Sequence, residues 1–520
     1  MIRTLFKPYW RTIWQDEMPP GSASVYTKPE VVSLILDLAG YTSDTRHLLD
    51  VRVLEPSCGD GAFLRGILSR LIVSEKPSRG EICWDDARWD LAVTAVDLSP
   101  QAVRESRSLI VSMLTGAGCP ETRAKHLSER WAYQADFLLH DWGNATFDVV
   151  VGNPPYVRIE QIPERVYVEY KNIWHTANDR ADLYVPFFEC GLGLISEGGA
   201  LAFICANRFA KNQYGASLRR LIAERYHVRH YINLEHTQPF LAKVSAYPAI
   251  IVIDKKRGAP THAETVADLD PVTMDRLREG HGVLGSENHF AEWYPNGAPW
   301  ISTSKTRHAS LVALERDYPT IEESAPGTRI GIGIATGADD VFVLPARRDD
   351  IEASRQIPLV MSSDVSNTTT AWSGHVLLNP FDDAGDGRLV NLDEYPGLKA
   401  HFDQFQSRLK QRHCAQNRPG QWFRTIDRYW PWLLRKPKLV IPDIQPGGII
   451  GYEPGSCYPH HNVYWIVSDS WDLGSLQRIL QSDFVTDQLR AFSVAMRGGS
   501  LRYQVQNLRK VRIPWPSSAS

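Results

Sequence analysis

The hydrophobic positions in the first half of the chain form short continuous runs separated by amphipathic stretches. Apolar runs at residues 91–96 and 147–151, and a shorter one at 131–134, have the length and composition of buried strands. Residues 31–38 repeat apolar side chains at helical spacing shortly after a proline, which is typical of a helix start. We therefore predict a doubly wound α/β sheet for this half of the chain.

The second half has a different pattern. Residues 329–337 and 341–344 alternate like the two arms of a hairpin, and 439–442 and 463–467 predict further strands. A polar stretch dotted with proline and glycine separates the two halves. The predicted order is an N-terminal extension at 1–20, an α/β domain at 21–258, a linker at 259–299 and a mixed α/β domain at 300–520.

Composition narrows the class of protein. The 520 residues are 43% hydrophobic and 22% charged, as expected for a large soluble protein with more than one core. No apolar run reaches the roughly 18 residues of a membrane helix, and the N-terminus lacks the apolar centre of a signal peptide. Seven cysteines without a Cys-x-x-Cys pair favour a reducing compartment. We expect a cytoplasmic protein without membrane contact.

Directly after the run at 147–151 the chain reads Gly-Asn-Pro-Pro-Tyr. Ligands of open α/β sheets bind beyond the carboxyl ends of the strands, so Asn153 and Tyr156 are expected to face a ligand. The prolines stiffen the turn and remove two donors, which leaves the Asn153 side-chain oxygen and the Pro154 carbonyl as acceptors. This edge suits an NH2 group, although the same residues also fit an ordinary proline-rich turn.

Such an edge has a chemical use. The exocyclic amine of adenine is a poor nucleophile, because its lone pair is delocalised into the ring. When that nitrogen attacks a methyl group it becomes tetrahedral, and two acceptors along its N–H bonds stabilise the transition state more than the flat ground state. No general base is needed for the attack, and Tyr156 offers a face on which a base could stack.

Residues 54–64, Leu-Glu-Pro-Ser-Cys-Gly-Asp-Gly-Ala-Phe-Leu, have the form of a strand, a glycine turn and a helix. Gly59 and Gly61 allow the backbone to approach a ligand closely. The loop lacks the three-glycine spacing of dinucleotide sites and the lysine of a P-loop, so a phosphate is not its natural guest. Glu55 instead suits the ammonium group of a methionine moiety.

Acidic residues follow the next two predicted strands. Asp97 ends the run at 91–96, where ribose hydroxyls are usually held in such sheets. Asp136 follows 131–134 and could accept a hydrogen bond from an adenine amine while Phe137 packs on the ring. Thr27 precedes the helix at 31–38, where it is either a helix cap or a residue that closes over a cofactor.

In this order, the motifs around Thr27, Glu55, Asp97, Asp136 and Asn153 resemble the gamma class of DNA adenine amino-methyltransferases, above all the TaqI-like enzymes of restriction and modification. The resemblance spans residues 20–256, in which 198–206 and 246–254 resemble later strands of that domain. It implies S-adenosylmethionine as cofactor and a bacterial source. The residues at matching cofactor positions are Thr27, Glu55, Ser57, Cys58, Gly59, Asp97, Asp136, Phe137 and Pro155.

The resemblance also implies a catalytic group of Asn153, Pro154, Tyr156 and Phe240. A base inside a duplex is out of reach, so the target adenine must be flipped out of the stack. Tyr156 and Phe240 would sandwich the flipped base while the acceptors at 153 and 154 hold its amine. Simple core packing is the alternative for Phe240.

Double-stranded DNA is thus the expected partner, and the net charge of −3 requires that positive charge be local. Residues 401–440 carry nine basic residues against two acidic ones, and the aromatic residues Trp422, Phe423, Tyr429, Trp430 and Trp432 lie among them. This pattern favours contacts to phosphates and bases, although a folded domain also buries tryptophans. Residues 497–512 carry five more basic residues with no acid between them, and we expect them on the same face.

Three functions stay open. The first is a stand-alone DNA adenine methyltransferase, which the long basic and aromatic extension favours. The second is methylation of RNA or of a protein glutamine, because the edge at 153–156 can hold any planar amide or amine. The third is a non-catalytic DNA specificity subunit, which the intact edge argues against.

The sequence shows neither a nuclease segment nor a complete metal site, and both absences shape the predictions about partners and metals. Only about 20 residues precede the cofactor motifs and no cleavage triad is evident, so we expect a monomer that relies on a separately encoded restriction nuclease or defence protein. Cys457, His460 and His461 have the spacing of half a metal site. No second half is evident in the sequence, so no metal is predicted.

Overall fold

The computed structural model describes residues 9–14, 26–43, 47–76, 81–158, 161–178, 181–242, 247–256, 258–279, 287–291, 293, 297–301, 305–445, 447–492 and 501–516. The chain divides into two compact units, Met1–His308 and Ala309–Ser520. No helix in these ranges is both long enough and apolar enough to cross a membrane.

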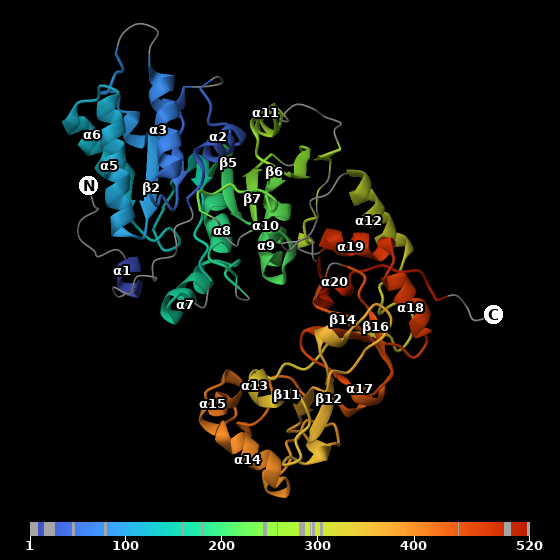
Figure 1. Ribbon diagram of the computed structural model, residues 1–520. Coiled ribbons are helices and arrows are strands. Elements are labelled where there is room, and N and C mark those ends of the chain that lie inside the picture. The colour runs from blue at the N-terminus through green and yellow to red at the C-terminus, as the bar shows by residue number, and fades with distance from the viewer. Residues whose placement is uncertain are drawn as a thin grey trace. The chain divides into compact units, whose positions relative to one another are not determined.

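A nine-stranded sheet forms the centre of the first unit, with the order β3-β2-β1-β4-β5-β7-β6-β8-β9 (Figure 1). The neighbours from β3 to β5 are parallel, whereas β7 is antiparallel to both β5 and β6. The strands are β1 (Val53–Glu55), β2 (Val93–Asp97), β3 (Ala132–Gln134), β4 (Phe147–Gly152), β5 (Ile195–Ala206), β6 (His227–Asn233), β7 (Pro248–Asp254), β8 (Thr261–Thr265) and β9 (His289–Phe290).

Helices cover both faces of this sheet (Figure 1). The helices of this unit are α1 (Tyr9–Trp14), α2 (Pro29–Leu38), α3 (Ala62–Glu75), α4 (Trp89–Ala92), α5 (Pro100–Gly116), α6 (Glu121–Trp131), α7 (Glu164–Ile173), α8 (Tyr184–Leu194), α9 (Arg208–Lys211), α10 (Ala216–Arg225) and α11 (Pro271–Glu279), and the boundary between the units falls within α12 (Lys305–Asp317). The predicted doubly wound α/β architecture is therefore confirmed.

Burial on both faces explains why the central strands read as continuous apolar runs. In β5, Ala202 and Ile204 pack with α2 and α3 in one core cluster, whereas Phe203 packs on Phe188 of α8, with ring centroids 5.1 Å apart. Every residue of β7 is buried. A strand covered by helices on both faces favours apolar side chains at most positions.

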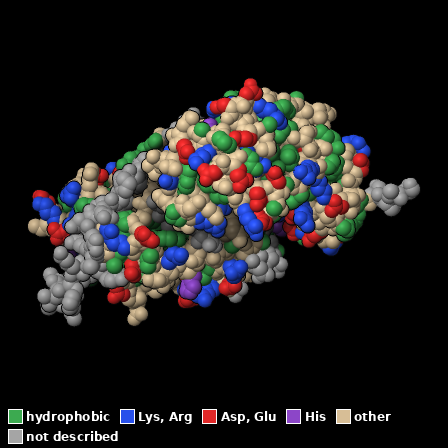
Figure 2. Space-filling model, turned by 90° about the horizontal axis from the view of Figure 1, so that it is seen from below, with side chains coloured by type: hydrophobic (Ala, Val, Ile, Leu, Met, Phe, Trp, Pro, Cys, Tyr) green, Lys and Arg blue, Asp and Glu red, His purple; other side chains and the backbone are tan. Residues whose placement is uncertain are grey.

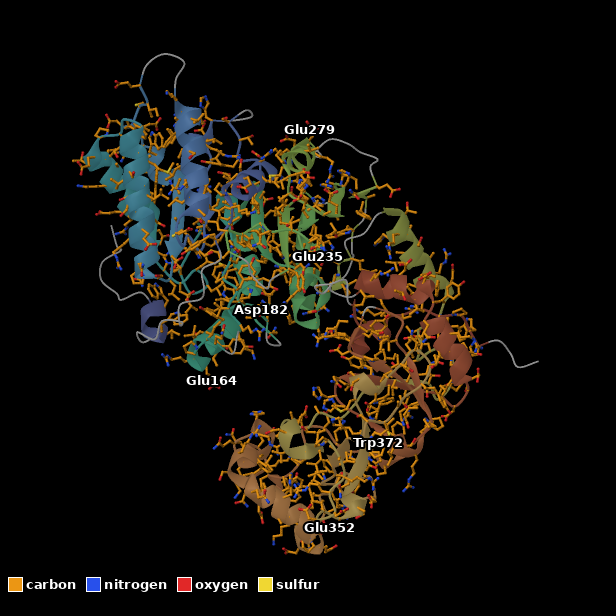
Figure 3. The ribbon with its side chains drawn as sticks, viewed as in Figure 1. Glu164, Asp182, Glu235, Glu279, Glu352 and Trp372 are labelled. Atoms are coloured by element: carbon orange, nitrogen blue, oxygen red, sulfur yellow. The ribbon has the colours of Figure 1, made fainter. Side chains whose placement is uncertain are left out.

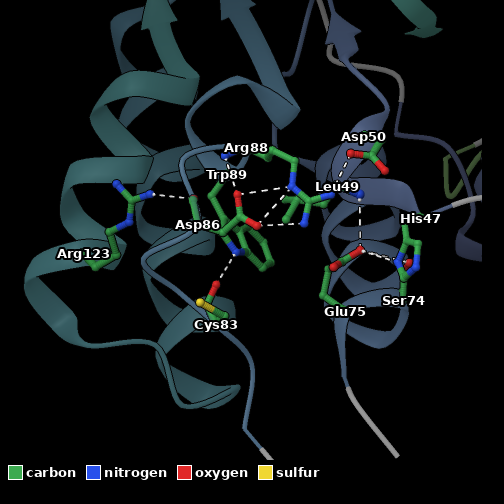
Figure 4. Close-up of polar contacts among 10 residues, drawn as sticks. All are labelled: His47, Leu49, Asp50, Ser74, Glu75, Cys83, Asp86, Arg88, Trp89 and Arg123. Atoms are coloured by element: carbon green, nitrogen blue, oxygen red, sulfur yellow. Dashed lines mark hydrogen bonds and ion pairs between the residues drawn. The ribbon is translucent and has the colours of Figure 1, made fainter.

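Polar contacts link the segments beside α3 and α4 in the first unit (Figure 4). Arg88 bonds to Asp86 and to Asp50, each at 2.7 Å, and the indole of Trp89 donates to the Cys83 carbonyl at 3.0 Å. Solvent screens both of these ion pairs, so the buried Trp89 ring provides most of the packing here.

The structure corrects two predicted boundaries. The stretch at 259–299, predicted as a linker, supplies α11 and two strands of the sheet: β8 pairs with β6, and β9 pairs with β8. The Thr-His-Ala-Glu-Thr sequence of β8 lacks the apolar run that predicts a buried strand. Its polar side chains can nevertheless be buried, because other side chains form contacts with them. His262 stacks on His289 with centroids 4.9 Å apart, and Glu264 bonds to Arg276 at 2.9 Å. At the other end, α1 lies in the predicted extension 1–20 yet packs against α7 of the first unit.

The second unit contains two four-stranded sheets, ordered β10-β18-β14-β16 and β11-β13-β12-β17, and a small β15-β19 pair. Its strands are β10 (Arg329–Ile332), β11 (Val343–Leu344), β12 (Gln356–Val360), β13 (Val376–Leu378), β14 (Lys438–Pro442), β15 (Ile444–Gln445), β16 (Gly451–Glu453), β17 (Tyr458–Pro459), β18 (Val463–Val467) and β19 (Leu501–Arg502). Its helices are α13 (Asp339–Phe342), α14 (Pro396–Gln404), α15 (Gln406–Lys410), α16 (His413–Gln416), α17 (Pro431–Arg435), α18 (Leu473–Leu480), α19 (Asp483–Phe492) and α20 (Val505–Leu508).

The predicted strands at 439–442 and 463–467 are confirmed as β14 and β18, which pair with each other. The predicted hairpin is wrong. Its first arm, β10, pairs with β18, and its second arm is divided between α13 and β11, which pairs with β13. Alternation predicted the extended backbone correctly but carried no information about which strand lies next to it.

Polar contacts link neighbouring segments of this mixed unit. Glu352, which is labelled in Figure 3, accepts hydrogen bonds from the backbone amides of Gly397 and Leu398 at the start of α14. Lys438 of β14 forms a fully buried ion pair with Glu453 of β16. A carboxylate at a helix start satisfies otherwise unpaired amides, and a buried pair links two neighbouring strands.

Candidate functional site

The segment that follows β4 is held on two sides. On one side, the Ser57 hydroxyl after β1 donates to the Asn153 carbonyl at 3.1 Å. On the other, Asn153 Nδ2 donates to the Thr27 hydroxyl at 3.4 Å. Thr27 in turn forms a β-bridge with Phe240. The carboxyl ends of β1 and β4, the segment before α2 and the segment after β6 therefore meet at Asn153.

Two predicted aromatic residues stand close together here. The rings of Tyr156 and Phe240 are 6.3 Å apart at their centroids and nearly perpendicular, at 83°. Phe240 is 1% exposed and packs in the main core, and the Tyr156 hydroxyl is buried without a hydrogen-bond partner among the described residues. Burial raises the pKa of that hydroxyl well above its usual range. The rings are adjacent but not parallel, so a base could stack between them only if one ring rotated.

The glycine loop links β1 to α3 as predicted. Gly61 adopts a φ of 82° before α3, and an added Cβ there would lie 2.6 Å from the Leu109 side chain, so only glycine fits. The Gly59 amide donates to Asp97 Oδ2 at 3.0 Å, and the Ser99 amide donates to Oδ1 at 2.8 Å. Each Asp97 oxygen thus keeps acceptor capacity for another donor.

Glu55 lies at the end of β1 and is 1% exposed. Its Oε2 atom has no hydrogen-bond partner among the described residues. Burial raises the pKa of Glu55 well above its usual range, and the neighbouring carboxylates Asp97 and Asp60 raise it further. Three acids that repel one another, one of them buried with an unused oxygen, fit a cationic ligand.

Asp136 differs from its expected role, because its acceptor positions are filled by the protein. Oδ2 accepts from the Trp14 indole and the Tyr170 hydroxyl, both at 2.7 Å. Oδ1 accepts from the backbone amides of Leu138 and Leu139 at 2.8 and 3.2 Å. A carboxylate offers about four such positions. An adenine amine could bind there only if one of these donors moved away.

The remaining predicted residues lie beside this group. Cys58 is buried, and the Ser106 hydroxyl lies 3.3 Å from its sulfur. Phe137 packs on Phe187 with centroids 4.9 Å apart. Pro154 is buried and Pro155 is half-buried.

Sequence reasoning missed three groups near these residues. Trp14 and Tyr170 come from segments outside the matched motifs. A third group surrounds Tyr184, whose ring lies 6.4 Å from Tyr156 and whose hydroxyl lies 3.0 Å from that of Tyr214. Tyr214 donates to Asp182, which is labelled in Figure 3, at 3.1 Å. Because these aromatic residues are far apart along the chain, no local sequence pattern predicts that they contact one another.

Comparison with known proteins identifies the family to which the chain belongs. Residues 94–240 match the family model of the Eco57I restriction-modification methylase. The chain is 41% identical over 500 residues to the Type II methyltransferase M.PaeR7I of Pseudomonas aeruginosa, covering 94% of this chain and 85% of that protein. It is 39% identical over 513 residues to M.BstVI of Geobacillus stearothermophilus, covering 95% and 90%. The chain belongs to the Type II methyltransferases.

A solved structure supports the fold of this Type II methyltransferase. The Type IIL restriction-modification enzyme MmeI, solved with DNA, superposes with a TM-score of 0.60 at 13% identity, over 92% of this chain and 63% of that one. With this family membership, the predicted resemblance to restriction-modification methylases is confirmed. The protein is a site-specific DNA methyltransferase that depends on S-adenosylmethionine.

Ion pairs neutralise part of the positive charge in the basic stretches of the methyltransferase. In 401–440, Arg408 and Lys436 pair with Asp340 and Asp469, while Arg418 and Arg435 are exposed. Of the rings there, Phe423 and Tyr429 are core residues, whereas Trp430 and Trp432 are about two-fifths exposed, at 40% and 39%. Basic and acidic side chains are interspersed on the face shown in Figure 2.

The stretch at 497–512 forms ion pairs with distant acids. Arg502 pairs with Asp443 at 3.0 Å, Arg509 with Glu322 at 3.1 Å and Arg512 with Glu323 at 3.4 Å. Arg497 lies outside the described residues. Because these acids come from other segments, counting charges along 497–512 overstated its free positive charge.

Proposed function

We propose that this methyltransferase methylates the exocyclic N6 amine of an adenine that is flipped out of duplex DNA. One observation carries the proposal: Asn153 follows β4 directly, and contacts from Ser57 and Thr27 hold it beside the acidic group at Glu55. An acceptor for an amine and a group suited to a cation therefore lie at neighbouring strand ends.

The acidic group would hold the cofactor. S-adenosylmethionine supplies an electrophilic methyl group on a sulfonium. In our proposal Glu55 binds its ammonium and Asp97 its ribose hydroxyls, because the first is a buried acid with an unused oxygen and the second keeps acceptor capacity. Gly59, Ser57, Cys58, Phe137 and Pro155 would line the rest of this site, and Thr27 would close it.

The segment after β4 would orient the amine. The Asn153 side-chain oxygen and the Pro154 carbonyl accept its two N–H bonds, which favours the tetrahedral nitrogen of the transition state. Tyr156 and Phe240 would stack on the base, with one ring turning from the perpendicular arrangement. Fixing the amine in this orientation lowers the entropy cost of the reaction.

The second unit would bind DNA through its exposed basic and aromatic side chains, among them Arg418, Arg435 and Trp430. We also propose that the protein acts as a monomer and that cleavage of unmodified DNA belongs to a separately encoded restriction nuclease. The relatives are named Type II methyltransferases, which favours this arrangement over methylation of RNA or of a protein glutamine.

The test is methyl transfer to a duplex oligonucleotide, followed by analysis of the nucleosides for N6-methyladenine. Asn153→Ala is expected to lower kcat about a hundredfold or more, as loss of one oriented hydrogen bond does in oxyanion holes. Asn144→Ala, at an exposed position shortly before β4, is the matched control and should leave kcat unchanged. Methyl groups found on cytosine, on RNA or on protein instead would overturn the adenine assignment.

A further inference from the structure

Three side chains of the second unit direct lone-pair atoms at one point. Asp339 Oδ2 lies 3.1 Å from His460 Nε2 and 3.6 Å from His461 Nδ1, and the two histidine nitrogens are 3.1 Å apart. Asp339 begins α13, whereas the histidines lie between β17 and β18, about 120 positions away in sequence. Among the described residues, this is the group of His, Cys, Asp and Glu side chains spaced to hold a metal ion.

The triangle has the dimensions of one face of a metal coordination shell. An ion bonded to nitrogen or oxygen at about 2.0–2.1 Å holds neighbouring donor atoms about 2.8–3.0 Å apart in octahedral geometry and about 3.3–3.4 Å apart in tetrahedral geometry. The three observed distances lie close to these values. Lone pairs on atoms this close repel one another unless a cation or a shared proton lies between them.

Neighbouring residues orient two of the three donors. His460 Nδ1 lies 2.7 Å from Asn462 Oδ1, so its N–H donates there and Nε2 keeps its lone pair for the triangle. The Thr336 hydroxyl donates to Asp339 Oδ1, which leaves Oδ2 free to point at the histidines. Hydrogen bonds of this kind to the far side of each ligand are characteristic of protein metal sites.

The backbone brings the two segments together independently of these side chains. The Ile334 amide donates to the Pro459 carbonyl at 2.9 Å, and the His460 amide donates to the Val360 carbonyl at 3.1 Å. Gly333 permits this approach, because an added Cβ would clash with the Pro459 and His460 carbonyl oxygens. Cys457 packs in an apolar cluster with Val440 and Val463 and is not part of the triangle. Asp339 is therefore the further ligand that the sequence analysis did not find. It is too far from the histidines along the chain for a spacing motif to include it.

We propose that Asp339, His460 and His461 bind one divalent transition-metal ion of the zinc class. Two imidazoles and one carboxylate suit zinc or cobalt better than magnesium or calcium, which prefer oxygen ligands. The side chains of Asp339 and His461 are 42% and 43% exposed, so water completes the coordination from the solvent side. The ion ties the loop before α13 to the turn between β17 and β18. Its ligands belong to the second unit, whereas the residues of the proposed catalytic group belong to the first.

The test uses the full-length protein, stripped with a chelator and titrated with Co²⁺ and then Zn²⁺. We expect one Co²⁺ per chain with the visible absorption of a nitrogen and oxygen site, and its displacement by Zn²⁺. Asp339→Ala and His461→Ala should each weaken binding at least about tenfold, since loss of a mere supporting hydrogen bond costs about 10- to 100-fold. Asp340→Asn, whose carboxylate pairs with Arg408, and His413→Ala, an exposed imidazole, are matched controls that should bind normally.

Wild-type protein that binds Co²⁺ and Zn²⁺ no better than Asp339→Ala or His461→Ala would overturn the proposal. In that case a proton shared between a histidine and Asp339 holds the triangle. Both variants replace half-exposed side chains, and circular dichroism in the presence of chelator confirms that they fold. If either variant fails to fold, loss of the cobalt spectrum in the other decides the question.

Discussion

The indole nitrogen of Trp14 donates a 2.7 Å hydrogen bond to the buried carboxylate of Asp136, across 122 positions of the chain. Arg165 of α7 holds the same helix by donating to the Ile13 and Trp14 carbonyls at 2.7 and 3.0 Å. The amino-terminal segment is thus joined to a residue at the end of β3 that was expected to contact cofactor.

Trp14→Phe removes this indole donor and keeps an aromatic ring. We expect the free energy of unfolding of the first unit to fall by about 1–3 kcal/mol, because a buried acceptor loses its partner. S-adenosylmethionine should bind at least as tightly, since one acceptor position of Asp136 becomes available. Denaturant unfolding and calorimetric binding measure the two effects. Clearly weaker cofactor binding would show that Trp14 itself belongs to the cofactor site.

The raised pKa of Glu55 predicts a pH-dependent cofactor affinity. Burial and the nearby acids favour the protonated form in the free protein, whereas an ammonium ligand favours the ionised form. Affinity for S-adenosylmethionine should therefore increase as the pH rises through the pKa of Glu55, with proton release on binding. Calorimetry in buffers of different ionisation enthalpy measures that release.

Glu55→Gln is the matching variant for this pH effect. It should bind the cofactor about 10- to 100-fold more weakly at high pH, in line with the roughly 1.5–3 kcal/mol of a charged hydrogen bond. It should also show little pH dependence. A variant that retains the full wild-type pH dependence would remove Glu55 from the ammonium site.

Arg418 and Arg435 should contribute to DNA affinity through phosphates. Each Arg→Ala change is expected to weaken binding to all sequences alike and to reduce the slope of log affinity against log salt by about 1. Arg408→Ala is the control, because Asp340 already compensates its charge. Fluorescence anisotropy at several salt concentrations measures the slopes. Equal effects at all three positions would contradict the distinction between free and paired arginines.

Lys438→Met should destabilise the second unit strongly. The side chains of Lys438 and Glu453 are 0% and 1% exposed, so the variant leaves a buried charge without its partner, at a cost of about 3–5 kcal/mol. Lys436→Met removes a more exposed pair with Asp469 and should cost at most about 1 kcal/mol. Amide hydrogen exchange in β14 and β16 reports this unit alone. Equal protection in both variants would contradict the prediction.

The sequence alone determined the parts of the protein whose environment is uniform. β4 and β7 read as strands because helices cover both faces of the sheet, which favours apolar residues at most positions; Asp148 and Asp254 are the charged exceptions. The turn after β4 and the glycine loop after β1 were also predictable, because prolines and glycines restrict the backbone locally wherever they occur.

Only the tertiary structure decided which polar groups meet. The buried polar strand β8, the saturation of Asp136 by Trp14, and the approach of Asp339 to His460 all join segments that are distant along the chain. Hydrophobic periodicity records whether a position is buried, since burial depends on the local face of a helix or strand. It does not record the partner that makes burial of a polar group favourable, because that partner is supplied by the topology of the chain.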